Sequence, residues 1–184
     1  MNVSKTTLVL ALAAAMVLKP NGDQAKAASD DPLEMDAEYA LQMLYDSSPS
    51  AAEMGKTAKA ILVFPEVVKI GFMWAGGFGE GVLIKDGKVS GHYNTTSGSY
   101  GFQAGAHRYG YAVFLMTDDA VKYLDRSKGW EIGAGPSITM VDVGRAKKIT
   151  STTINTDAYA VVFGQRGLMA GVGIEGSKIS LIER

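Results

Sequence analysis

Basic side chains gather in two parts of an otherwise weakly charged chain. One group follows Gly144 in an expected loop, and the other lies on an expected helix and in the strand after it. The first group is Arg145, Lys147 and Lys148, and the second is Lys56, Lys59 and Lys69. Such residues either form a solvated surface or bind an anionic group such as a lipid headgroup. Each basic residue near an anionic membrane contributes about 1 kcal/mol, so three fall short of the roughly 4 kcal/mol of millimolar affinity. Binding to a membrane therefore also requires a contribution from apolar contacts or from a pocket.

Motifs for catalysis or metal binding are weak. Residues 171–176 read G-x-G-x-x-G, but the eight residues that follow leave no room for the helix and second strand of a dinucleotide fold. No G-x-S-x-G sequence is present. His92 and His107 are the only histidines, and without a positioned carboxylate they make a weak metal claim. We therefore expect no catalytic residue, no metal and no cofactor, with an unrecognised hydrolase as the minor alternative.

Composition restricts the classes of protein further. The absence of cysteine excludes disulfide frameworks, thiolate nucleophiles and zinc–thiolate sites. A net charge of −1 argues against a nucleic-acid partner, which favours a basic excess. With 47% hydrophobic and 20% charged residues, the 184-residue chain is typical of one globular domain.

The N-terminal residues resemble a targeting signal. A short segment with one lysine precedes an uncharged run over 6–18, which is shorter than the roughly 20 apolar residues of a spanning helix. Ala25-Lys26-Ala27 has the small-x-small form of a signal-peptidase site. We expect a signal peptide over 1–27, cleaved near Ala27, and a single mature domain over 28–184 that is periplasmic or secreted. The alternative is an uncleaved membrane anchor.

The mature chain divides into a helical part and a strand-rich part. Apolar residues at helical spacing from Leu33 to Leu44 predict an amphipathic helix, and the capping-box pattern at 50–53 predicts a second. An N-cap at Thr117 and the apolar face that follows predict one late helix over 118–127. Between and after these, many short strands are expected, with an Asp86-Gly87 hairpin turn. The fold class is α+β and mainly β: a curved antiparallel barrel or sandwich with two N-terminal helices and one late helix.

Glycine is concentrated in the strand-rich part. Twenty of the 22 glycines lie between Gly71 and Gly176, and several recur with period two, as at Gly77, Gly79 and Gly81. Alternate residues of a strand share a face, so each such set leaves one strand face without side chains. A bare face admits a packed helix, a second sheet or a ligand, with close packing the favoured interpretation.

Several glycine-containing motifs resemble the SYLF domain, a lipid-binding family. The match begins at 60–72 and 76–83 and continues in the family's order over about 35–182. The later blocks are 100–105, 112–116, 134–136 and 167–176. The last block contains the G-x-G-x-x-G sequence of residues 171–176. The resemblance assigns this sequence to a strand motif of the family and not to a dinucleotide-binding loop.

The resemblance implies a non-enzymatic domain that binds a phospholipid or a membrane surface. Eukaryotic SYLF members bind phosphoinositides and some bundle actin, but this chain carries no SH3 or FYVE module. We expect headgroup contacts from both basic groups, and apolar contacts from Phe72 and Trp74, with Met73 between them. The competing interpretation of these three side chains is strand core. The alternative function is a cell-envelope scaffold with a protein partner.

Overall fold

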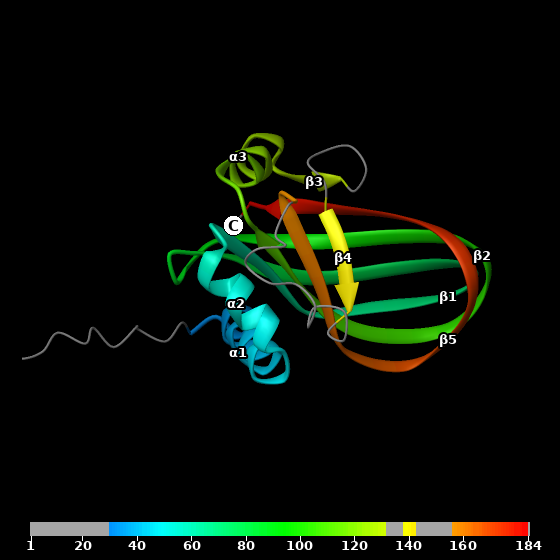
Figure 1. Ribbon diagram of the computed structural model, residues 1–184. Coiled ribbons are helices and arrows are strands. Elements are labelled where there is room, and N and C mark those ends of the chain that lie inside the picture. The colour runs from blue at the N-terminus through cyan, green and yellow to red at the C-terminus, as the bar shows by residue number, and fades with distance from the viewer. Residues whose placement is uncertain (1–29, 132–137, 143–155, 184) are drawn as a thin grey trace, which may run out of the picture.

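The structure is a computed structural model that describes residues 30–131, 138–142 and 156–183 (Figure 1). Its elements follow the order α1, α2, β1, β2, α3, β3, β4 and β5. The predicted signal peptide over 1–27 and the basic group at Arg145, Lys147 and Lys148 lie outside the described residues. Both therefore stay predictions.

The three described helices begin at side-chain caps. Helix α1 spans Pro32–Ser47, α2 spans Pro49–Thr57 and α3 spans Asp118–Ser127. Ser48 ends α1 and also caps α2, where its hydroxyl accepts a hydrogen bond from the backbone N–H of Ala51. The second helix thus begins two residues earlier than the capping-box pattern at 50–53 predicts, because proline suits the first helical position. None of the described helices is long and apolar enough to cross a membrane.

Three long antiparallel strands form most of the sheet. Strand β1 spans Ala60–Lys85, β2 spans Lys88–Leu115 and β5 spans Ala158–Ile182, and they pair in the order β1–β2–β5. On the far side of β5, β3 (Gly129–Glu131) pairs antiparallel and β4 (Ile138–Asp142) pairs parallel. The predicted α+β, mainly β class with two N-terminal helices and one late helix is confirmed. The curved sheet is single and does not close into a barrel, as far as the chain is described.

The long strands double back, so one sheet supplies two layers (Figure 1). In β1 the return follows Met73, which has a left-handed φ of 59° and lies at an irregularity in the pairing with β2. A Cβ atom on Gly79 would lie 2.6 Å from the carbonyl oxygen of Glu66, and one on Gly81 would meet the carbonyl oxygen of Val63. The bare face predicted from Gly77, Gly79 and Gly81 therefore receives the first half of the same strand. The expected short strands are halves of long strands that continue through the bend.

Two cores lie on opposite faces of the first half of the sheet. One, between the layers and under α3, includes Leu62, Phe64 and Tyr111, and the rings of Phe64 and Tyr111 stack with centroids 4.7 Å apart. The other packs α1 and α2 against Val63 and Phe114. Successive residues of a strand point to opposite faces of the sheet, so they contribute side chains to one core and to the other in turn. All three helices lie at one end of the molecule, and the bend forms the other end (Figure 1).

Candidate functional site

The bend carries a group of exposed apolar side chains. We call this region the tip and define it as residues 70–78 of β1 and 96–106 of β2, which pair with each other. Among the side chains of the tip that the structure describes, the large exposed ones are Ile70, Phe72, Met73, Trp74, Phe78 and Tyr100. Phe72 is 75% exposed and Trp74 is 70% exposed. Large apolar side chains gathered on a protruding surface mark a contact site more often than chance exposure.

The backbone at Met73 explains why consecutive side chains are exposed. In a regular strand, neighbouring residues point to opposite faces and one of them would be buried. Here Phe72 pairs with Ala104 whereas Trp74 pairs with Tyr100, so the register shifts between them. Trp74 and Tyr100 then pack against each other, with ring centroids 4.3 Å apart. The strand-core interpretation of Phe72, Met73 and Trp74 is therefore wrong.

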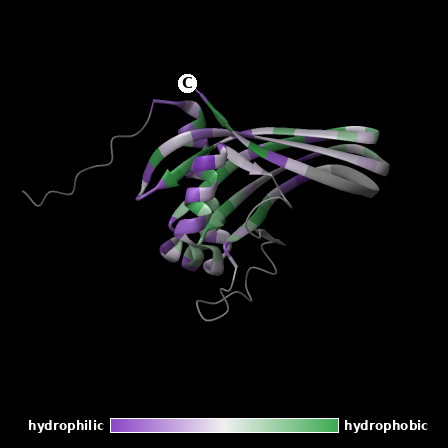
Figure 2. Cartoon of the chain, turned by 90° about the horizontal axis from the view of Figure 1, so that it is seen from above, coloured by the Kyte–Doolittle hydropathy of each residue, from purple (hydrophilic) through white to green (hydrophobic). Residues whose placement is uncertain are grey.

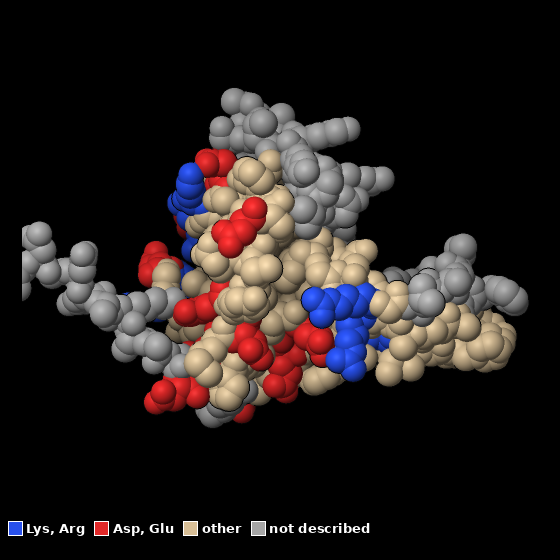
Figure 3. All heavy atoms as spheres, turned by 90° about the horizontal axis from the view of Figure 1, so that it is seen from below, with Lys and Arg blue, Asp and Glu red and all other residues tan. Residues whose placement is uncertain are grey.

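The tip contains none of the residue types that are charged near neutral pH. The segments 70–79 of β1, 93–106 of β2 and 167–174 of β5 contain no Lys, Arg, His, Asp or Glu, and their pairing brings them together. On the face shown in Figure 3, Lys and Arg side chains gather where the tip joins a body rich in Asp and Glu. The strands around the bend carry few strongly hydrophilic residues, whereas the helices display them (Figure 2).

Two exposed arginines lie next to the tip. Arg108 and Arg166 are direct neighbours across β2 and β5, just beyond the uncharged segments. Arg108 forms an exposed ion pair with Glu66, at 3.3 Å between Nη1 and Oε1. Sequence analysis did not select these arginines, because they are far apart along the chain and only the register of the sheet makes them neighbours.

The predicted site residues divide between the two ends of the molecule. Phe72 and Trp74 are together on the tip. Lys69 lies at its base but is only 8% exposed and contacts the inner face near Gly77. Lys59 is exposed just before β1, thirteen residues from Phe72, which corresponds to about 40 Å along an extended strand. Lys56 lies on α2, paired with Glu53 at 2.5 Å. The structure therefore does not bring the second basic group together around one ligand.

A groove of about 430 Å³ lies between the N-terminal helices and the β1–β2 turn. Its lining includes Leu41, Tyr45, Lys59 and Asp86. Burial raises the pKa of Tyr45 to about 12, so this phenol stays neutral at physiological pH. The groove mixes acidic, basic and apolar groups and lies at the opposite end from the tip, so it does not extend the apolar surface.

Comparison with known families finds a match to the second half of the chain. The model of the family Ysc84, described as "Las17-binding protein actin regulator", matches residues 96–183. Residues 96–183 are thus similar to the Ysc84 family. This match confirms the SYLF resemblance over these residues. A comparison with curated proteins finds no match.

The Ysc84 segment contains one side of the tip. It includes most of β2 with Tyr100 and Arg108, and all of β5 with Arg166, whereas α1, α2 and β1 precede it. The description of Ysc84 names binding and regulation and no reaction. What this chain itself binds must be argued from the surface.

Proposed function

We propose that this protein binds lipid membranes by inserting its tip into the interface between headgroups and acyl chains. The observation that carries the proposal is the uncharged end of the sheet, from which Phe72, Trp74 and Tyr100 project into solvent. Aromatic side chains with a polar atom are favoured at membrane interfaces, where one end of the ring is apolar and the other is hydrated. The absence of charge from the segments of the three strands at the tip removes the main cost of entering that layer.

Apolar contacts supply what the basic residues lack. Arg108 and Arg166 add about 1 kcal/mol each at an anionic surface, and less for Arg108 because Glu66 already pairs with it. Fully burying one large apolar side chain contributes about 1.5–3 kcal/mol. Two or three side chains of the tip therefore outweigh the arginines. Acidic residues on the body would be repelled by anionic lipids, which favours an orientation with the tip toward the membrane (Figure 3).

Tryptophan fluorescence tests this proposal directly, because the chain has two tryptophans in contrasting places. Trp74 is on the tip, whereas Trp130 is 3% exposed and packs against Tyr123. In the Trp130→Phe variant, vesicles of mixed phosphatidylcholine and phosphatidylglycerol should shift Trp74 emission to shorter wavelength. Lipids brominated on the acyl chains should quench it. In the unaltered chain, the part of the emission that comes from the exposed Trp74 should be quenched in the same way. This comparison controls for any effect of the Trp130→Phe substitution on folding.

Two results would overturn the proposal. If neither the unaltered chain nor the Trp130→Phe variant sediments with anionic or neutral vesicles, the membrane-binding proposal is wrong. If the protein sediments but Trp74 emission stays unchanged, a different face binds the membrane.

A second candidate function is a scaffold that binds a protein through the same tip. The description of Ysc84 as a Las17-binding protein favours it, and an exposed apolar surface suits a protein as well as a lipid. A stoichiometric partner that shields Trp74 from acrylamide, together with no response to vesicles, would select this candidate.

The proposal includes export to the periplasm or the exterior. It is supported by the uncharged run over 6–18 and the small-x-small sequence ending at Ala27. Expression in a bacterial host, followed by intact mass measurement of the periplasmic fraction, should give a chain that begins at Ala28. A chain that retains Met1 would contradict cleavage.

A further inference from the structure

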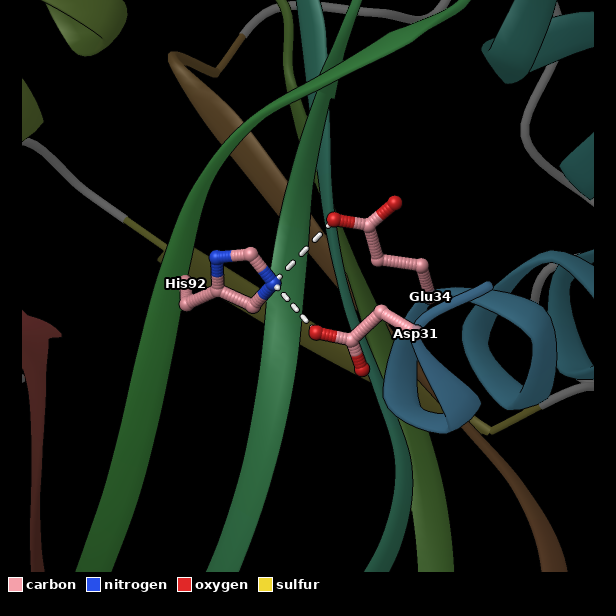
Figure 4. A group of neighbouring side chains, drawn as sticks. All are labelled: Asp31, Glu34 and His92. Carbon is pink, nitrogen blue, oxygen red and sulfur yellow. Dashed lines mark ion pairs between the residues drawn. The ribbon is translucent and has the colours of Figure 1, made fainter. Parts of the chain in front are cut away.

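A histidine and two carboxylates meet where the first helix packs against the sheet. Asp31 is the N-cap residue of α1, Glu34 lies in its first turn, and His92 comes from β2 (Figure 4). The Nε2 atom of His92 is 3.2 Å from Oε1 of Glu34 and 3.5 Å from Oδ2 of Asp31. The three side chains are all partly buried, with exposed fractions between 17% and 26%.

The imidazole nitrogen at this junction is enclosed but not hydrogen-bonded. Nε2 of His92 has almost no solvent exposure and makes no hydrogen bond in the described part of the chain. In Figure 4 it points between the two carboxylates rather than along a line to either oxygen. A buried nitrogen that makes no hydrogen bond carries a free-energy cost. Its direction suits a third atom that lies between the nitrogen and both oxygens.

The spacing of the three atoms fits a metal ion. In a tetrahedral zinc site with bonds of about 2.0–2.1 Å, neighbouring ligand atoms lie about 3.3–3.4 Å apart. The two distances from Nε2 bracket this value, and the nitrogen and carboxylate oxygens all lie within 4.8 Å of one another. Asp31 is also held in place, because its other oxygen, Oδ1, accepts a hydrogen bond of 2.9 Å from the backbone N–H of Leu33. Such support of a ligand is a regular feature of metal sites.

We propose that Asp31, Glu34 and His92 bind a divalent transition-metal ion of the zinc type, with the remaining coordination position open to water. Two carboxylates around one neutral imidazole carry a charge of −2, which a divalent cation neutralises. The imidazole favours zinc-type ions over magnesium or calcium, which take oxygen ligands. The bound ion would join the start of α1 to β2, two elements that are far apart in the sequence. Its role would be structural, since the site lies at the helical end of the molecule and not on the tip.

Metal binding to variants of the two histidines tests this site. The purified chain, prepared without a histidine tag and freed of metal with a chelator, is titrated with Zn²⁺ by calorimetry. One ion should bind per chain, and Mg²⁺ should not compete. His92→Gln and Glu34→Gln should each lower the affinity at least tenfold. His107→Gln is the matched control, because His107 is the other histidine of the chain and stacks on Tyr109 instead, and its affinity should be unchanged.

Two further measurements keep the test independent of folding and of membrane binding. Co²⁺ should give the visible absorption of a four-coordinate site, and His92→Gln should remove it. Zn²⁺ at one hundred times its Kd should raise the Tm of the unaltered chain by about 5–10 °C and leave that of His92→Gln unchanged. The proposal is overturned if Zn²⁺ does not bind, or if it binds His92→Gln as tightly as the unaltered chain. Because this experiment does not measure vesicle binding, the metal-site proposal and the membrane-binding proposal can each fail without the other.

Discussion

Replacing Phe72 with alanine should weaken membrane binding without disturbing the fold. Phe72 is the most exposed of the large apolar side chains on the tip, at 75%. Its backbone pairs with Ala104 through main-chain atoms, which alanine keeps. The substitution therefore removes a surface side chain and leaves both cores intact.

The exposed fraction sets the size of the expected effect. Full burial of a phenylalanine side chain contributes about 1.5–3 kcal/mol, and three quarters of that surface is still free to enter a membrane. The loss is then about 1–2 kcal/mol. Because each 1.4 kcal/mol is a factor of ten, the partition coefficient should fall by roughly 5- to 30-fold.

The control is an exposed aromatic residue elsewhere. Tyr39 lies on α1 and is 69% exposed, so Tyr39→Ala removes a similar exposed ring from the opposite end of the molecule. Its partition coefficient should change by less than about twofold, since the ring would not enter the membrane. Both variants are compared with the unaltered chain by co-sedimentation with vesicles over a range of lipid concentrations. Thermal unfolding of each variant checks that the fold is kept.

Equal effects of the two substitutions would refute the reasoning. If Phe72→Ala and Tyr39→Ala weaken binding alike, the chain adsorbs without a preferred face. If Phe72→Ala has no effect while binding persists, the tip stays outside the membrane.

The remaining predictions concern the stability of the doubled sheet. A Cβ atom at Gly79 would lie 2.6 Å from a backbone oxygen of the facing half-strand, so Gly79→Ala should lower the free energy of unfolding by about 1–3 kcal/mol in urea. Gly76→Ala is the control, because nothing lies within 4 Å of a Cβ atom there, and it should change stability by less than about 0.5 kcal/mol. Burial raises the pKa of both Tyr45 and Tyr93 to about 12, whereas tyrosine in the unfolded chain titrates near 10. Between these values the unfolded chain binds fewer protons than the folded one, so the Tm should fall as the pH rises from about 10 to 12. Tyr45→Phe should reduce that fall, and an unchanged pH dependence would show that Tyr45 does not contribute to it.

Local elements of the fold are predictable because their signals are adjacent in sequence. The late helix begins after Thr117, whose hydroxyl accepts from the N–H of Ala120, as its type and position indicate. The hairpin turn at Asp86 and Gly87 adopts the left-handed φ values of 50° and 72° that the pair favours. These features depend on interactions within a few residues and need no tertiary context.

The candidate site is less predictable, because burial depends on the bend. Phe72 and Trp74 are both predicted as apolar contacts, but alternation along a strand equally permits a core position for either. Only the irregularity at Met73 exposes both. Lys69, predicted as a headgroup contact, is buried instead because the strand returns over it. The junction of His92 with two carboxylates escaped prediction, since Asp31 and Glu34 look like an ordinary acidic start to a helix.

The sequence by itself determined the class of fold, the positions of the helices and the family resemblance of residues 96–183. These features could be predicted because apolar periodicity, helix caps and repeated glycines are patterns of residues that lie close together in the sequence. The tertiary structure alone decided which faces meet water and which distant side chains meet each other. A strand that doubles back buries Lys69 and exposes Trp74, and the register of β2 with β5 makes neighbours of Arg108 and Arg166. These outcomes depend on contacts between residues that are far apart in the sequence, and no short sequence pattern encodes such contacts.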